Sequence, residues 1–128
     1  MLGGSQAFSS YSVDDVPRAK AFYEDTLGVK VTEDTEMGIL QLDANGTTAM
    51  LYPKKDHQPA TFTVLNFVVP DIDKAVDQLT EDGVRFERYD DGEIETDERG
   101  ISLGDGPRIA WFKDPAGNIL SVLETSAS

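Results

Sequence analysis

The sequence predicts an α+β fold made of two tandem modules, each with the order strand, helix, strand, strand, strand. One observation is an internal repeat: Val13–Ala19 aligns with Val69–Ala75 at an offset of 56 residues. A second is that the turn Asp43–Gly46 aligns with Asp114–Gly117 at an offset of 71 residues. Because the matches occur in the same order in both halves, and because such a repeat marks the folding unit, the chain is expected to hold two copies of one module.

The repeat also predicts the domain organisation. We expect one domain over residues 1–128, in which modules 7–52 and 62–124 are joined by the polar linker 53–61. The second offset is larger than the first by about 15 residues. The second module is therefore expected to carry an insertion between Arg88 and Gly106.

Local patterns justify each element of the first module. Asp15 is a typical N-cap residue, Pro17 suits the first turn of the helix, and Gly28 suits its end. Asn45-Gly46 favours a tight hairpin turn. The strands expected in this module are Phe8–Val13, Val29–Glu33, Ile39–Leu42 and Thr47–Tyr52.

The second module repeats this pattern. Asp71 is the expected helix cap and Gly83 the expected helix end. Its expected strands are Phe62–Val69, Val84–Tyr89, Arg108–Lys113 and Asn118–Glu124. The two modules together predict a curved mixed sheet around a central cavity, with the helices on the outer face. Small-molecule sites form in such concavities, so the cavity is the expected ligand site.

Composition excludes several classes of partner and site. The chain has 128 residues, 24 acidic against 11 basic residues, a formal charge of −13 and no cysteine. The acidic excess disfavours nucleic acid and anionic lipid as partners, and the lack of cysteine excludes disulfides and thiolate ligands. No apolar stretch is long enough for a membrane helix, and no signal peptide is recognisable. We therefore expect a cytoplasmic protein with no nucleic-acid or membrane partner.

Two segments carry a family resemblance. Val13–Val16 with the following Ala21–Gly28 resembles the opening of the vicinal oxygen chelate superfamily, and Trp111–Leu120 resembles its closing hairpin, FxDPxGN. This superfamily includes glyoxalase, extradiol dioxygenases and the bleomycin- and fosfomycin-resistance proteins. The resemblance covers nearly the whole chain and implies the fold above and a two-fold homodimer. It does not imply one activity, because the fold hosts several chemistries.

The resemblance implies four metal-ligand positions, two in each module. In this sequence they are Phe8, Met50, Val64 and Ser121. None is a His, Glu or Gln, and no residue one position to either side is a carboxylate or an imidazole. A divalent cation needs several such ligands in a defined geometry. We expect that the metal site is lost and that the protein has no cofactor.

Strand alternation selects the residues that share a face with these positions. Asn66 is informative because it interrupts an apolar strand, and a buried amide needs either a neighbouring side chain or a ligand as its partner. Trp111 would be either a stacking surface or part of the core. The candidate ligand-binding residues are Ser10, Ser12, Thr48, Met50, Tyr52, Asn66, Trp111 and Ser121.

Two further features bear on the site. The sole histidine, His57, lies in the linker and is either a solvated loop residue or a hydrogen-bond donor or general base at the rim of the pocket. Tyr52 is the other candidate catalytic residue. The insertion holds six acids within nine residues, which predicts a solvated loop. Its position in the second module also makes it a candidate lid over the cavity.

The sequence thus predicts a glyoxalase/bleomycin-resistance-like protein that binds a small, uncharged or weakly polar molecule in the sheet cavity without a metal. A cationic ligand is an alternative if the acidic insertion folds over the mouth of the cavity. One alternative is a metal-independent isomerase or lyase that uses His57, Tyr52 or Asn66. A less favoured alternative is a divalent-metal-dependent enzyme of the glyoxalase or dioxygenase type.

Overall fold

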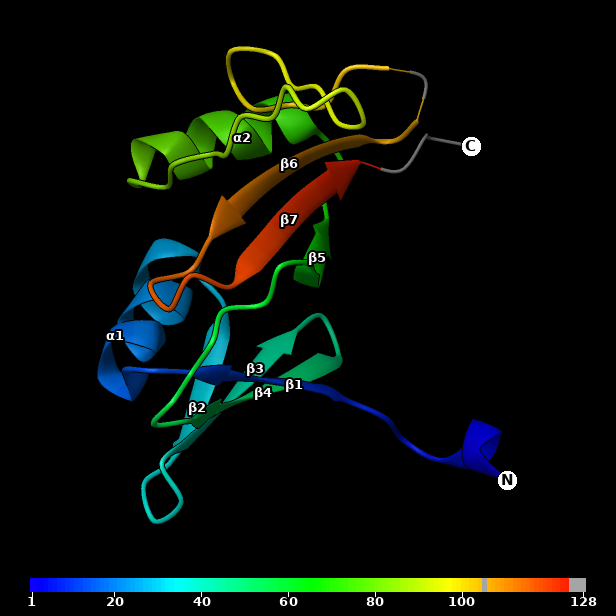
Figure 1. Ribbon diagram of the computed structural model, residues 1–128. Coiled ribbons are helices and arrows are strands. Elements are labelled where there is room, and N and C mark those ends of the chain that lie inside the picture. Colours follow the sequence, from blue (N-terminus) through cyan, green and yellow to red (C-terminus); the bar gives the residue numbers. More distant parts are fainter. Residues whose placement is uncertain (105, 125–128) are drawn as a thin grey trace. The chain divides into compact units, whose positions relative to one another are not determined.

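The computed structural model describes residues 1–104 and 106–124, and these form two compact units that meet in sequence between Gln58 and Pro59 (Figure 1). Residue 105 and the last four residues of the expected domain 1–128 lie outside the described part. Each unit holds one α-helix and one mixed sheet, with seven strands in total among the described residues. This confirms the predicted α+β class and the tandem modules.

The first unit follows the predicted element order. Asp15 caps α1 by accepting a hydrogen bond from the backbone N–H of Arg18 at 3.1 Å. Asn45 (φ 49°) and Gly46 (φ 88°) both adopt the left-handed backbone that the predicted hairpin turn requires. The strands stand in the order β1-β4-β3-β2. The elements are a 3₁₀ turn Leu2–Gly4, β1 Ser9–Val13, α1 Val16–Ala21, a π-helical turn Phe22–Thr26, β2 Lys30–Asp34, β3 Ile39–Ala44 and β4 Thr47–Pro53.

The core of this unit lies between its helix and one face of its sheet. Ala19 and Tyr23 of the helical segment are buried, and the hydroxyl of Tyr23 is 2.7 Å from that of Tyr11 on β1. The sheet residues buried on this face are Tyr11, Val13, Leu40, Leu42, Ala49 and Leu51. The alternate residues of β1 and β4 therefore lie on the opposite face, which we call the helix-free face of the first sheet.

The second unit has the strand order β5-β7-β6, with α2 packed along β6 and β7 (Figure 1). Asp71 caps α2 through the backbone N–H of Lys74 at 3.2 Å, as predicted. Glu124 at the end of β7 accepts a second hydrogen bond, from the N–H of Ile72 at 2.9 Å. The elements are β5 Thr63–Val68, α2 Ile72–Glu81, β6 Arg108–Lys113 and β7 Ile119–Glu124.

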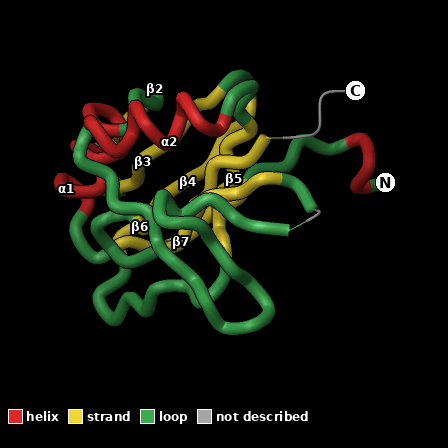
Figure 2. Tube along the Cα trace, turned by 90° about the horizontal axis from the view of Figure 1, so that it is seen from above, coloured by secondary structure: helices red, strands yellow, loops and turns green. Residues whose placement is uncertain are grey.

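The strand expected over Val84–Tyr89 does not form as one element, and Figure 2 shows the described part of the connection from α2 to β6 as loop. Two short segments share the edge of β6 instead. Phe86 bridges to Phe112, and Ile101 bridges to Ala110. The insertion interrupts the strand: the chain leaves the sheet edge after Glu87 and rejoins it at Ile101.

Gly100 allows the insertion to return to the sheet. Its φ is +89°, and an added Cβ would lie 2.8 Å from the Cβ of Phe86 and 2.9 Å from the backbone oxygen of Glu87. Both the backbone conformation and the available space therefore exclude a side chain here.

Replacing Gly100 should destabilise the second unit more than replacing another glycine of similar conformation. We expect Gly100→Ala to lower the free energy of unfolding by about 3 kcal/mol, because left-handed strain and overpacking add. The matched control is Gly92→Ala, at φ +87° with no atom within 4 Å of its added Cβ, for which strain alone predicts about 1 kcal/mol. Urea unfolding of both variants measures the difference, and equal losses would contradict the packing argument.

Candidate ligand-binding site

Strand register brings five of the candidate ligand-binding residues to the helix-free face of the first sheet. In the parallel pair β1–β4, Ser10 lies opposite Met50 and Ser12 opposite Tyr52. Thr48 precedes Met50 by two residues on β4 and so shares its face. All five side chains are exposed or half-buried, whereas Tyr11 and its neighbours on the other face are buried. Their proximity to one another is therefore established, and their contact with a ligand stays a prediction.

His57 joins this face from the linker. Its Nδ1 lies 2.6 Å from the hydroxyl oxygen of Ser12, and its ring is half-buried. The backbone N–H of His57 also donates to the carbonyl of Lys54 at 3.1 Å. The imidazole is thus held against a candidate residue rather than solvated in a loop. An imidazole beside a hydroxyl is a side-chain pair that can take part in proton transfer to a bound molecule.

The same unit has a hollow that the sequence did not predict. It has a volume of about 660 Å³, and Met50 lines it together with Met37, Ile39 and Gln41. Its other lining residues come from β2 and the following turn: Thr32, Glu33, Asp34, Thr35 and Glu36. Strand alternation alone did not indicate this hollow, because the turn between β2 and β3 supplies three of its nine lining residues, Thr35, Glu36 and Met37.

In the second unit, three candidate residues form one row across the sheet. Asn66 on β5 and Trp111 on β6 both lie opposite Ser121 on the central strand β7. The hydroxyl of Ser121 donates to Oδ1 of Asn66 at 2.5 Å, and the Ser121 side chain is fully buried. Asn66 itself is exposed, not buried as expected. A neighbouring side chain thus satisfies its amide oxygen.

Trp111 belongs to the helix-free face of this second sheet rather than to the core. It is half-buried, while its neighbours Ala110 and Phe112 are fully buried on the face that α2 covers. Its ring meets that of Tyr89 edge to face, with centroids 5.5 Å apart. Burial raises the pKa of the Tyr89 hydroxyl, and the carboxylates of Glu87 and Asp91 raise it further. Tyr89 therefore stays neutral at physiological pH and adds to the aromatic surface.

The residues at the expected metal positions do not fit a metal ion. Phe8 precedes β1 and is 61% exposed, and Val64 lies where the register between β5 and β7 shifts. Met50 offers a thioether, and the hydroxyl proton of Ser121 is donated to Asn66. Within residues 1–104 and 106–124, no group of three or more His, Cys, Asp and Glu side chains is arranged to hold a metal ion. This donor set is unsuitable for a hard or borderline cation.

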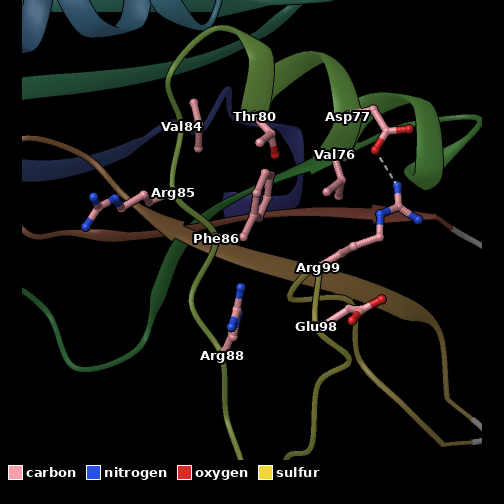
Figure 3. A pocket seen from close by; sticks show the side chains of 9 residues that line it. All are labelled: Val76, Asp77, Thr80, Val84, Arg85, Phe86, Arg88, Glu98 and Arg99. Carbon is pink, nitrogen blue, oxygen red and sulfur yellow. Dashed lines mark hydrogen bonds and ion pairs between the residues drawn. The ribbon is translucent and has the colours of Figure 1, made fainter.

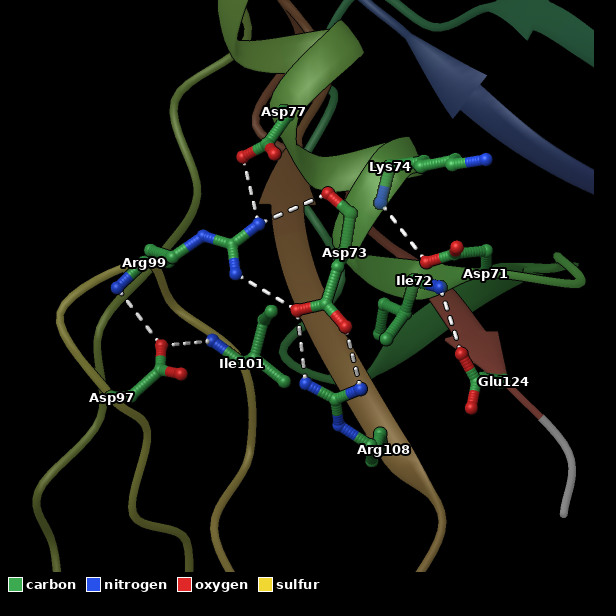
Figure 4. Close-up of polar contacts among 10 residues, drawn as sticks. All are labelled: Asp71, Ile72, Asp73, Lys74, Asp77, Asp97, Arg99, Ile101, Arg108 and Glu124. Carbon is green, nitrogen blue, oxygen red and sulfur yellow. Dashed lines mark hydrogen bonds and ion pairs between the residues drawn. The ribbon is translucent and has the colours of Figure 1, made fainter.

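The acidic insertion is anchored to α2 by one arginine (Figure 4). Arg99 donates to the carboxylates of Asp73 at 2.8 Å and Asp77 at 2.7 Å, and Arg108 of β6 donates to the other oxygen of Asp73 at 2.9 Å. Asp97 accepts from the backbone N–H groups of Arg99 and Ile101, which shapes the loop. The second half of the insertion therefore lies against the helix.

No helix in the described part of the chain is long and apolar enough to cross a membrane.

Comparison with known proteins finds one family model and many similar structures. The model of the Glyoxalase/Bleomycin resistance protein/Dioxygenase superfamily matches residues 7–122. A member of that superfamily from Sphaerobacter thermophilus is 26% identical, with a TM-score of 0.67, and the match covers 94% of this chain and 98% of that one. No curated protein sequence matches the chain significantly.

Two further structures share the fold at lower identity. TnmS3, an antibiotic binding protein from Streptomyces sp. CB03234, is 24% identical with a TM-score of 0.69, and the match covers 96% of this chain and 98% of that one. The fosfomycin resistance protein FosX from Listeria monocytogenes is 12% identical with a TM-score of 0.70, over 96% of this chain and 94% of that one. At these identities the likeness shows the fold alone.

The anchor of the insertion should make stability depend on pH in the acid range. Hydrogen bonds from Arg108 and then Arg99 lower the pKa of Asp73 from 3.8 to about 2. A carboxylate whose pKa is lower in the folded state contributes stability above its unfolded pKa, and that contribution is lost as pH falls toward the folded value. We therefore expect stability to fall more steeply between pH 4 and pH 2 in the wild type than in Asp73→Asn.

Urea unfolding midpoints measured at successive pH values test this expectation. The matched control is Asp14→Asn, which removes an exposed carboxylate of the first unit and should keep the wild-type pH profile. Parallel profiles for the wild type and Asp73→Asn would show that the network does not stabilise the fold.

Proposed function

Because the chain belongs to the Glyoxalase/Bleomycin resistance protein/Dioxygenase superfamily, we propose that it binds a small organic molecule at the helix-free faces of its sheets without a metal ion. One observation carries the proposal: a Ser121–Asn66 hydrogen bond stands where the superfamily resemblance implies a metal ligand. The fold relationship to an antibiotic binding protein supports binding as a function that this architecture performs.

The side chains at these faces indicate the chemistry of the ligand. Ser10, Ser12 and Thr48 offer hydroxyls, and Asn66 offers an amide N–H₂ group. Trp111, together with Tyr89, offers a flat aromatic surface. On the second sheet, this aromatic surface and the amide of Asn66 suit a neutral or weakly polar aromatic molecule that stacks and makes a few hydrogen bonds. The proposal includes a cytoplasmic homodimer, and gel filtration of the purified chain measures its oligomeric state.

The hydrogen bond between His57 and Ser12 favours a second candidate function. It places the sole imidazole on the face that bears Ser10, Met50 and Tyr52. An imidazole in this position could take a proton from a bound carbon acid and return it elsewhere, which is the chemistry of a metal-independent isomerase or lyase. A metal-dependent glyoxalase or dioxygenase activity has no comparable support from the side chains.

The binding proposal predicts a metal-free protein with a saturable small-molecule site. Protein purified without chelator should contain less than stoichiometric divalent metal by elemental analysis. A thermal-shift screen of aromatic metabolites and antibiotics should then give hits that also quench Trp111, the only tryptophan in the chain. We expect Asn66→Leu to weaken a hit about tenfold, because the amide donor is lost.

The control for that measurement is Ser9→Ala, an exposed serine of β1 on the face opposite Ser10 and Ser12, which should bind as the wild type does. Asn66→Asp separates binding from folding, because it keeps the oxygen that accepts from Ser121. One equivalent of tightly held divalent metal would overturn the proposal. An unchanged affinity in both Asn66 variants would remove this residue from the site.

The proton-transfer candidate predicts solvent exchange of a bound carbon acid. For screen hits with a C–H bond next to a carbonyl, NMR in D₂O should show deuterium uptake at that carbon. His57→Gln should slow this uptake about 100-fold or more and change affinity less than twofold. The control is Tyr52→Phe, which removes the hydroxyl of the other candidate catalytic residue and keeps His57. Comparison of the two variants shows which of these side chains the uptake depends on. Uptake that persists in His57→Gln would exclude the histidine as the base.

A further inference from the structure

A second cavity lies in the second unit on the side of the sheet that α2 covers, away from Asn66 and Trp111. It has a volume of about 540 Å³. Three segments build it: the second half of α2, the chain that follows α2, and the end of the insertion (Figure 3). Its size falls within the range of about 300–1,000 Å³ that is usual for small-molecule sites. None of these residues is at a position that the repeat or the superfamily resemblance marks as functional.

The inner wall of this cavity is apolar and includes an aromatic ring. Val76 and Val84 are 2% and 5% exposed, and Phe86 is half-buried. The Phe86 ring is held edge to face against Phe112 of β6, with centroids 5.5 Å apart. Because the sheet edge fixes Phe86 through its bridge to Phe112, the ring is a rigid surface against which a flat apolar group can pack.

The rim of the cavity is rich in arginine. Arg85, Arg88 and Arg99 all line it, which is three of the 11 basic residues of a chain with 24 acids. Arg99 is committed to Asp73 and Asp77. Neither Arg85 nor Arg88 forms an ion pair with any carboxylate that the structure describes. In Figure 3 the guanidinium of Arg88 points toward Phe86, whereas that of Arg85 points away.

The charges at the rim indicate how much negative charge a ligand should carry. The lining contains three arginines and two acids, Asp77 and Glu98, so its formal charge is +1. A ligand with one negative charge would balance the site, whereas a phosphate dianion would exceed it. The planar guanidinium also matches a carboxylate in a two-point hydrogen-bonded contact.

We propose that this cavity is a second binding site, which takes an aromatic carboxylate with its carboxylate on Arg88 and its ring against Phe86. The apolar wall supplies the burial of the ring, and Arg88 supplies the charge. Arg99 lines another part of the cavity, where its ion pair with Asp77 holds it in place. The site is independent of the helix-free faces, so it stands whether or not these faces bind a ligand.

The test is an NMR titration of the full chain with 2-naphthoate as the probe. We expect saturable shifts of the amide signals of Thr80, Phe86, Arg88 and Arg99, without comparable shifts at Ser12 or Trp111. The uncharged 2-naphthamide should bind at least about tenfold more weakly, because it cannot form the ion pair. Inorganic phosphate should produce no saturable shift at these residues, because it has no ring and too much charge.

Matched variants identify the residue that binds the carboxylate. Arg88→Gln should raise the dissociation constant of 2-naphthoate about tenfold or more, and Arg85→Gln should change it less than twofold. Both residues are exposed, so both variants should fold. Phe86→Leu should weaken 2-naphthoate while leaving the preference over 2-naphthamide intact.

Three results would overturn the proposal. They are equal affinity for 2-naphthoate and 2-naphthamide, equal effects of Arg88→Gln and Arg85→Gln, and shifts confined to the helix-free faces. Asn66→Leu should leave the affinity of this cavity for 2-naphthoate unchanged. The variant therefore distinguishes a failure of this proposal from a failure of the function proposed for the helix-free faces.

Discussion

Period-two alternation along the strands is the constraint on which both units depend. Each helix buries one face of its sheet, so alternate residues of β1, β3, β4 and β6 are committed to the core. On β4, Ala49 and Leu51 are buried, while Thr48 and Met50 are not. A shift of one residue would exchange these two sets and place polar side chains beneath the helix. The register that builds the core therefore also decides which side chains a ligand can reach.

The central strand β7 shows how a polar residue fits within this scheme. Leu120, Ser121 and Val122 are all buried, so this strand has no exposed side for a hydroxyl. A buried hydroxyl without a partner costs free energy, and Asn66 on the adjacent strand supplies the acceptor. The pair explains why an amide interrupts the apolar strand β5. It also fills, with a neutral hydrogen bond, a position where the superfamily resemblance implies a metal ligand.

Features fixed by local chemistry were predictable from the sequence, and those fixed by distant contacts were not. Asp15 and Asp71 cap their helices as expected, because a cap needs only the next few residues. The contact between His57 and Ser12 joins residues 45 positions apart, and no short-range pattern indicates it. The split strand at the edge of β6 was also missed. Its two halves, at Phe86 and Ile101, become neighbours only after the insertion has folded.

The insertion links these observations, because the same segment that divides the edge strand creates the arginine-lined cavity. Had the chain continued along β6 beyond Glu87, an edge strand would have occupied this side of the sheet. The departure instead leaves Phe86 held at the edge and returns Arg99 to the helix, where two carboxylates pair with it. Arg88 lies beside the apolar wall of this cavity and forms no ion pair with a carboxylate in the described part of the chain. Its guanidinium is therefore available to the carboxylate of the proposed ligand.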